Sequence, residues 1–533
     1  MCLRLSRAIE QWNDYQLTDT EIKTVALRFR RKQLGFIKGP QSVLLISGAL
    51  AVVLIGLLMW TSNEGARPST SGSIFFYCAA GIKPPVHAAA EKYEQEYGIK
   101  IDLQYGGSGT LLSSLQVAQI GDIYLAADDS YIRIATEKGL AAESIPLAYL
   151  KPVIAVQKGN GKNIKGIADL LREDVSVALA NPDAASVGKA VKKTLTKSGQ
   201  WEKLKAATKV FKPTVMDVAN DIRLGVVDAG ILWDATVNQY TDHLESVPVP
   251  IFEQNRKQVT VTILKSSKQP TAALRFARYL GARDRGLLEF KKRGYVPVEG
   301  DVWSERPNLM LFSGAMLRLA IDQSINRFEE REGCEVTRIY NGCGILVSQM
   351  KTGERPDAYF SCDISFMRDV KNLFHESEDI SSNQMVLLVT KGNPKGIREL
   401  KDLTKPNLKV GMAHPEKSAL GLLTVRMMKK AGVYEEFMNT RNLVVDSATG
   451  DFLVNQIRTG SLDAVIVYRS NAVNVLEHLE VIPIDLPTAF AVQPYAVGRN
   501  SDHKYLMGRL LEAVKSAESK ERFLSVGFKW EAN

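Results

Sequence analysis

The stretch "YGGSGTLLSSL" (105–115) decides how this chain is organised. Three glycines surround one serine and lead directly into an apolar segment with the spacing of a helix. The same shape returns as "YNGCGILVSQM" (340–350), 235 residues later. Glycines let the backbone approach a ligand closely, and the start of a helix offers unpaired N–H groups with a positive dipole end. The pattern therefore predicts an anion-binding loop that occurs twice.

Other blocks of sequence keep nearly the same offset. "DAGILWDATV" (228–237) aligns with "DAVIVYRSNA" (463–472), and "NPDAASVGKA" (181–190) aligns with "HPEKSALGLL" (414–423). Several independent blocks at one offset indicate two copies of one unit. The predicted boundaries are repeat one at 74–300, a linker at 301–306 and repeat two at 307–533.

Short apolar runs alternate with helical patterns inside each repeat. "IFFYCA" (74–79) and "VSVALA" (175–180) are examples, each followed by a glycine-containing turn and a helix. This alternation predicts α/β lobes with doubly wound sheets. Ligands of such sheets collect beyond the carboxyl ends of the strands. Because helix starts follow strands in both halves of the unit, we expect a ligand cleft between two lobes.

The N-terminal segment contains a predicted membrane anchor. "VLLISGALAVVLIGLLMWT" (43–61) is uncharged and long enough to span a bilayer as a helix. Basic residues gather upstream, as in "RFRRK" (28–32), so residues 1–42 are expected in the cytoplasm. After a polar linker at 62–73, both repeats are expected in the periplasm, tethered to the inner membrane. A cleaved signal peptide is the alternative, which the long charged segment disfavours.

Composition excludes several classes of function. The net charge of +9 in 533 residues is a mild indication of anionic partners, but no basic run interleaved with aromatic residues indicates nucleic acid. Six unclustered histidines and five cysteines without CxxC spacing predict neither a metal site nor a cofactor. No nucleophile and base are paired in a recognisable motif, so no catalytic residues are assigned and the protein is not expected to be an enzyme.

In the order of its motifs, the region 74–297 resembles the periplasmic molybdate-binding proteins of ABC importers, within the type II solute-binding fold. The likeness rests on "AAG" after the first strand, "GGSGTL", "GDIYLAAD", "NPDAASVG" and "FKKRGY". The resemblance implies that each repeat consists of two doubly wound α/β lobes that close on an oxyanion. It also implies molybdate or tungstate as ligand and an ABC permease as partner.

Six ligand-binding residues follow from the resemblance in repeat one. These are Gly81, Ser108, Ser186, Val187, Val218 and Trp233. Gly81 stands where the family has a serine, and Trp233 stands where it has a tyrosine. A backbone amide and an indole N–H would therefore have to replace two hydroxyl donors.

The equivalent positions of repeat two carry different chemistry. They are Met316, Cys343, Leu420 and Tyr468. A thiol is a weaker donor than a hydroxyl, and methionine is bulky and apolar. We therefore expect repeat one to bind the oxyanion, and repeat two to bind it weakly, bind another ligand or serve in docking. Cys362 is expected near Cys343, with two isolated thiols favoured over a disulfide.

The predicted function is a membrane-tethered solute-binding receptor that delivers a molybdate-like oxyanion to an ABC importer. The alternative is a signalling or interaction protein, in which the extracytoplasmic lobes sense an anion and residues 1–42 report it.

Overall fold

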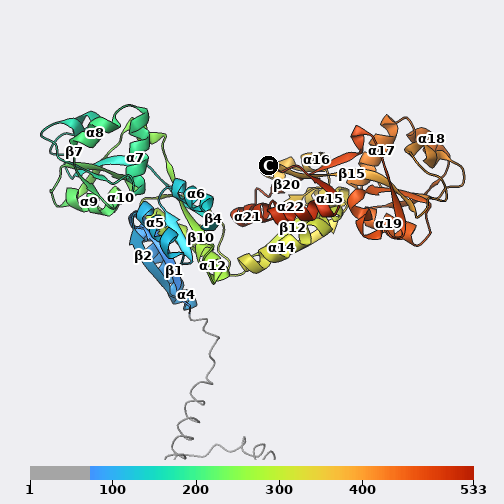
Figure 1. Cartoon of the computed structure of the whole chain (residues 1–533), viewed down its shortest axis with the longest axis horizontal. Coiled ribbons are helices and arrows are strands. Elements are labelled where there is room, and N and C mark those ends of the chain that lie inside the picture. Colours follow the sequence, from blue (N-terminus) through green and yellow to red (C-terminus); the bar gives the residue numbers. More distant parts are fainter. Residues whose placement is uncertain (1–71, 533) are drawn as a thin grey trace, which may run out of the picture. The chain divides into compact units, whose positions relative to one another are not determined.

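The computed structural model describes residues 72–532 of the chain. The predicted cytoplasmic segment 1–42 and the predicted membrane span 43–61 lie outside the described residues. From residue 72 to 532, no helix combines the length and apolar character needed to cross a bilayer. Each repeat is built from two α/β lobes, coloured blue to green in repeat one and yellow to red in repeat two (Figure 1).

The first lobe of repeat one contains a six-stranded sheet in the order β11-β4-β10-β3-β1-β2. Its strands are β1 (Ile74–Ala79), β2 (Ile101–Gly106), β3 (Ile123–Ala126), β4 (Ala141–Leu150), β10 (Lys257–Leu264) and β11 (Val296–Pro297). β1 pairs in parallel with both β2 and β3. Helix α4 (Lys83–Tyr97) follows β1, and helix α5 (Ser108–Ala118) follows β2. The carboxyl ends of these parallel strands meet at one edge, which brings the starts of the following helices together.

The second lobe of repeat one contains a five-stranded sheet in the order β7-β6-β8-β5-β9. Its strands are β5 (Pro152–Gln157), β6 (Val177–Ala180), β7 (Thr208–Lys212), β8 (Ala229–Trp233) and β9 (Leu244–Val247). Helices α7 (Ser186–Lys197), α9 (Val215–Arg223) and α10 (Asp234–Asn238) follow β6, β7 and β8. The chain enters this lobe from β4 to β5 and leaves it from β9 to β10.

Repeat two has the same order of elements but one continuous ten-stranded sheet. Its strands are β12 (Asn308–Gly314), β13 (Glu335–Asn341), β14 (Ala358–Phe360), β15 (Glu378–Thr390), β16 (Val410–Ala413), β17 (Leu443–Ser447), β18 (Ala464–Tyr468), β19 (Leu479–Pro483), β20 (Phe490–Val497) and β21 (Phe528–Trp530). β15 pairs with β20 in the first lobe and with β18 in the second. It therefore takes the place of both β4 and β5 of repeat one.

The repeats differ where the chain passes from the first lobe to the second. In repeat one β4 ends at Leu150 and β5 begins at Pro152, which pairs with Trp233. Met385 holds the matching place in repeat two and pairs with Tyr468. Proline has no backbone N–H to contribute to a strand ladder, whereas methionine has one. Proline alone does not break a strand here, because Pro146 lies within β4 opposite Thr260. The interruption in repeat one is the single residue Lys151, whose amide donates to the side chain of Asp234 (3.2 Å), whereas β15 of repeat two is continuous.

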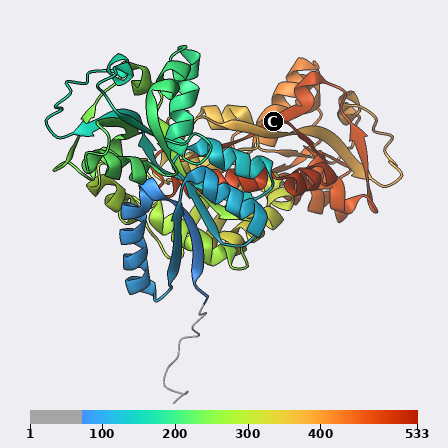
Figure 2. The ribbon, with the colours of Figure 1, turned by 60° about the vertical axis from the view of Figure 1, so that its left-hand side comes forward.

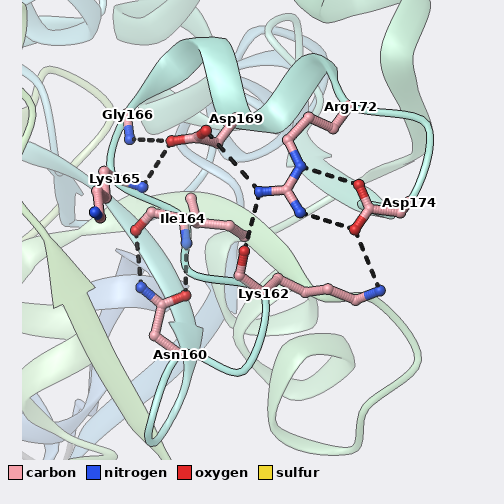
Figure 3. Close-up of polar contacts among 8 residues, drawn as sticks. All are labelled: Asn160, Lys162, Ile164, Lys165, Gly166, Asp169, Arg172 and Asp174. Atoms are coloured by element: carbon pink, nitrogen blue, oxygen red, sulfur yellow. Dashed lines mark hydrogen bonds and ion pairs between the residues drawn. The ribbon is translucent and has the colours of Figure 1, made fainter.

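A turn after β5 shows that the repeats agree in detail (Figure 3). Asn160 donates to the carbonyl of Ile164 (2.8 Å) and accepts from its amide (2.9 Å). Asp169 accepts from two backbone amides of the same turn. Asn393 and Asp402 make the same bonds 233 residues later. The duplication therefore extends to side-chain hydrogen bonding in a surface turn.

Helix α4 lies beside β1 in repeat one (Figure 2) and is tied to helix α13 (Gly286–Lys292). The tie is the buried carboxylate of Glu289, which accepts from Lys92 (2.7 Å), Lys292 (3.0 Å) and Arg293 (2.5 Å). Burial is the largest influence on this carboxyl and acts to raise its pKa. The three charged donors together outweigh burial and lower the pKa of Glu289 to about 2.

Replacing Glu289 by glutamine is expected to lower the free energy of unfolding by about 2 kcal/mol at neutral pH, because a neutral amide accepts more weakly from charged donors. The folded pKa is depressed below the ordinary 4.5, so the stabilisation is present above pH 4.5 and is lost as the pH falls toward 2. Urea unfolding at several pH values measures this difference, with the exposed Glu173→Gln as control. A difference that does not shrink in acid would contradict the assignment.

Candidate functional site

A hollow lies between the two lobes of repeat one, at the ends of the parallel strands. It is narrow, with a cavity volume of about 10 Å³. Five of the six predicted ligand-binding residues line it: Gly81, Ser108, Ser186, Val187 and Trp233. The other lining residues are Ala79, Ala80, Gly106, Gly107, Ala127, Ala185, Thr214 and Val215. The structure thus gathers residues from positions 79 to 233 around one small space, and their binding role stays a prediction.

Ser108 is the first residue of α5 and is only 1% exposed. Its hydroxyl oxygen accepts from the amide of Ala127 (3.4 Å), and its carbonyl accepts from the Tyr124 hydroxyl (2.7 Å). A serine oxygen that accepts from an amide still has its own proton to donate. Ser108 is therefore fixed in place with a donor left for the hollow.

Gly81 lies in the short 3₁₀ helix η2 (Ala80–Ile82) between β1 and α4. Its carbonyl accepts from the hydroxyl of Tyr295, which itself accepts from Gln239 (3.2 Å). A Cβ at Gly81 would lie 2.9 Å from Cγ1 of Val215 in the second lobe. The two lobes therefore meet at this corner, and glycine is what allows them to meet.

The glycine loop forms a second contact between the lobes. The amide of Gly109 donates to the carbonyl of Ala184 (2.8 Å). A Cβ at Gly107 would overlap the same carbonyl oxygen and lie 2.9 Å from the carbonyl oxygen of Pro213. The lobes of repeat one are thus in direct backbone contact beside the hollow.

The second lobe contributes two helix starts and the end of a strand. Ser186 and Val187 open α7, where first-turn amides have no acceptor within the helix. Val215 opens α9, whose cap Thr214 exchanges hydrogen bonds with Asp217. Trp233 ends β8 and is 1% exposed. The N-termini of α7 and α9 both present backbone amides at the hollow.

Val218 is the one predicted residue of repeat one that the structure places elsewhere. It lies one turn inside α9, fully buried, and a Cβ at Gly230 would lie 2.7 Å from its Cγ1. The hollow is lined instead by Val215, three residues earlier. The capping pattern "TVMD" (214–217) marks the start of α9 in the sequence and so indicates Val215 as the residue at the helix start.

None of the residues that line the hollow carries an ionisable side chain. Asp234 follows Trp233 and accepts from the amides of Lys151 (3.2 Å) and Ala235 (2.8 Å). Burial raises the pKa of Asp234, and the backbone hydrogen bonds oppose that rise. In the region from 72 to 532, no group of acidic, cysteine and histidine side chains is arranged to hold a metal ion.

In repeat two, the expectation of two isolated thiols is wrong. Cys343 and Cys362 form a disulfide, with Cα atoms 6.4 Å apart, and the Cys362 amide donates to the Cys343 sulfur (3.1 Å). Gly314 stands where repeat one has Ala79, and a Cβ there would overlap the Cys362 sulfur. The bond thus takes up the space of the missing methyl group and removes Cys343 as a donor.

The remaining equivalents in repeat two are buried side chains. Met316 is 6% exposed, and Leu420 and Tyr468 are nearly inaccessible. Gly450 holds the place of Val215, so the pair Gly81 and Val215 of repeat one becomes Met316 and Gly450. The larger residue of the pair belongs to the second lobe in repeat one and to the first lobe in repeat two. Burial also raises the pKa of Tyr468, whose hydroxyl has no partner among the described residues.

Comparison with known proteins shows the same division of the chain. The profile of the family described as bacterial extracellular solute-binding protein matches residues 74–296 and again 309–529. A binding protein from Haemophilus influenzae is 26% identical over 229 residues, which cover 43% of this chain and 93% of the relative. Molybdate-binding protein ModA of Mycobacterium tuberculosis is 29% identical over 227 residues, which cover 42% of this chain and 84% of that protein.

Among solved structures, the periplasmic molybdate-binding protein of Azotobacter vinelandii matches 42% of this chain and 99% of its own, with 18% identity and a TM-score of 0.37. Each of these proteins corresponds to about one repeat. The two successive profile matches cover most of the sequence. The chain therefore belongs to the bacterial extracellular solute-binding proteins, as a tandem duplication of one unit similar to the molybdate-binding proteins.

Proposed function

We propose that repeat one binds a divalent tetrahedral oxyanion of the molybdate or tungstate class and presents it to an ABC importer. The observation that carries this proposal is the chemistry of the hollow between the lobes. Backbone amides at helix starts, the hydroxyls of Ser108 and Ser186, and the indole of Trp233 surround it, without an ionisable side chain. The Thr214 hydroxyl also lines the hollow, but it donates to Asp217 (2.7 Å). A fully ionised oxyanion has only acceptors, and neutral donors of this kind can satisfy them.

The same donor set favours ions that stay fully deprotonated. A protonated phosphate needs an acceptor for its own hydrogen, which a carboxylate supplies best, and no carboxylate lines the hollow. Similarity to proteins named as molybdate-binding also supports this ligand class. Size would separate molybdate and tungstate from the smaller sulfate.

The location that fits this function is extracytoplasmic, with the segment 43–61 as membrane anchor. Disulfides form and persist in oxidising compartments, and Cys343 and Cys362 are disulfide-bonded. Anchoring would hold the receptor at high effective concentration near its permease. Protease protection of residues 74–533 in spheroplasts would contradict this topology.

Calorimetric titration of the full chain with molybdate, tungstate, sulfate and phosphate tests the function. We expect one high-affinity site per chain, for molybdate and tungstate, with phosphate the weakest. The Ser108→Ala variant should bind about tenfold more weakly, because one charge-assisted hydrogen bond is lost. Ser113→Ala, on the exposed side of the same helix, serves as control. Two equal sites per chain, or phosphate as the best ligand, would contradict the proposal.

A further inference from the structure

Thr236 carries a buried hydroxyl close to Gly81, behind the residues that line the hollow. It lies in α10, three residues after Trp233, and has no exposed surface. Its Oγ1 lies 3.8 Å from the point where a Cβ on Gly81 would stand, and Cδ1 of Trp233 lies 3.7 Å from that point. The hydroxyl is thus at the place where the predicted first-strand serine of the family is missing.

No group within residues 72–532 satisfies this hydroxyl. Thr236 Oγ1 is buried without a hydrogen-bond partner. The other atoms closest to a Cβ on Gly81 are carbons of Val215 and Trp233, which can neither donate nor accept. Buried hydroxyls in native proteins are nearly always hydrogen-bonded, so an unpaired one fits a partner from outside the chain. The hydroxyls of Tyr468 and Ser470 in repeat two are unpaired as well, and what distinguishes Thr236 is its position beside Gly81.

We propose that Thr236 Oγ1 donates a hydrogen bond to the oxyanion in repeat one and so replaces the serine hydroxyl that Gly81 lacks. This role rests on the proposed function. Ser108 belongs to the first lobe and Thr236 to the second, so the anion is held by a hydroxyl from each side. The hydroxyl of Thr236 is then satisfied only when the ligand is bound between closed lobes.

The matching position of repeat two provides an internal comparison. Asn471 stands there, and its Oδ1 accepts from the amide of Tyr468 (3.2 Å). Its Nδ2 donates to Asp451 (2.8 Å). Both polar atoms of this side chain therefore have partners inside the protein. The hydroxyl of Thr236, in the repeat that carries the hollow, has no partner at all among residues 72–532.

The test uses Thr236→Val in the full chain, because valine has nearly the same shape without the hydroxyl. Molybdate affinity measured by calorimetry should fall about tenfold, as expected for the loss of one hydrogen bond to a charged ligand. The urea midpoint of the ligand-free protein should stay the same or rise, because an unsatisfied buried polar group is removed. A merely structural threonine would lose stability and affinity together.

Two further variants separate hydrogen bonding from packing. Thr236→Ser keeps the hydroxyl and should retain affinity within about twofold of the wild type. Thr194→Val changes a nearly buried threonine outside the hollow and should leave affinity unchanged. A tenfold loss in the serine variant would assign the effect to packing and overturn the role. Unchanged affinity in Thr236→Val, with binding by the wild type, would overturn this role alone. Absence of anion binding in the wild type would overturn the proposed function as well.

Discussion

Gly81→Met is expected to weaken molybdate binding by about a thousandfold, ~4 kcal/mol, because it places the side chain of repeat two into the hollow of repeat one. The Cβ alone would lie 2.9 Å from Val215 Cγ1. The longer methionine side chain would extend among Trp233 and Thr236, where the ligand is proposed to bind. Calorimetric titration with molybdate measures the loss.

A second substitution distinguishes a filled site from a misfolded one. Val215→Gly in the Gly81→Met background recreates the combination of Met316 and Gly450 found in repeat two. The double variant should recover much of the urea stability lost by the single variant but none of the binding. Recovery of molybdate affinity would show that the methionine does not occupy the ligand's space.

Gly107→Ala is expected to reduce molybdate affinity by about a hundredfold, ~2.7 kcal/mol, by holding the lobes of repeat one apart. The added methyl group would overlap the carbonyl oxygen of Ala184 in the opposite lobe. Opening the lobes relieves the overlap but separates Ser108 from the donors of the second lobe. Because one buried hydrophobic cluster extends through both lobes, the free energy of unfolding should fall as well, which makes the comparison of lobe opening the decisive measurement.

The matched control is Gly161→Ala, since a Cβ at Gly161 meets nothing within 4 Å. It should bind molybdate like the wild type. Small-angle scattering should show a more open repeat for Gly107→Ala in the presence of molybdate than for either the wild type or the control. Equal affinity of Gly107→Ala and Gly161→Ala would refute the closing role of this contact.

The sequence predicts the duplication and most of the hollow because both depend on local patterns. A glycine loop that opens a helix, as at Ser108, leaves backbone N–H groups unpaired at the helix start, and this depends only on the local sequence. Val187 follows in the same way from the helix start after its strand, whereas Trp233 was assigned from the resemblance to the molybdate-binding proteins. The α/β architecture with two lobes in each repeat was predicted for the same reason and is confirmed.

Features that depend on contacts across space were not predicted. The bond between Cys343 and Cys362 requires the room that Gly314 leaves on a neighbouring strand. The unpaired hydroxyl of Thr236 is recognisable only once Gly81 lies opposite it. The sequence does contain a signal for the start of α9, the cap pattern "TVMD". This signal indicates Val215 as the residue at the helix start, one turn before the predicted Val218.

Strand β15 gives the two repeats different mechanics. In repeat one the lobes are joined by two connections, Lys151 between β4 and β5 and the segment from β9 to β10, so rotation at a few backbone bonds in each can move one lobe against the other. In repeat two the single strand β15, 13 residues long, is hydrogen-bonded to strands of both lobes. Moving these two lobes against each other would bend β15, and the strands paired with it on both sides would resist the bending. We therefore expect the lobes of repeat one to open and close more easily than the lobes of repeat two.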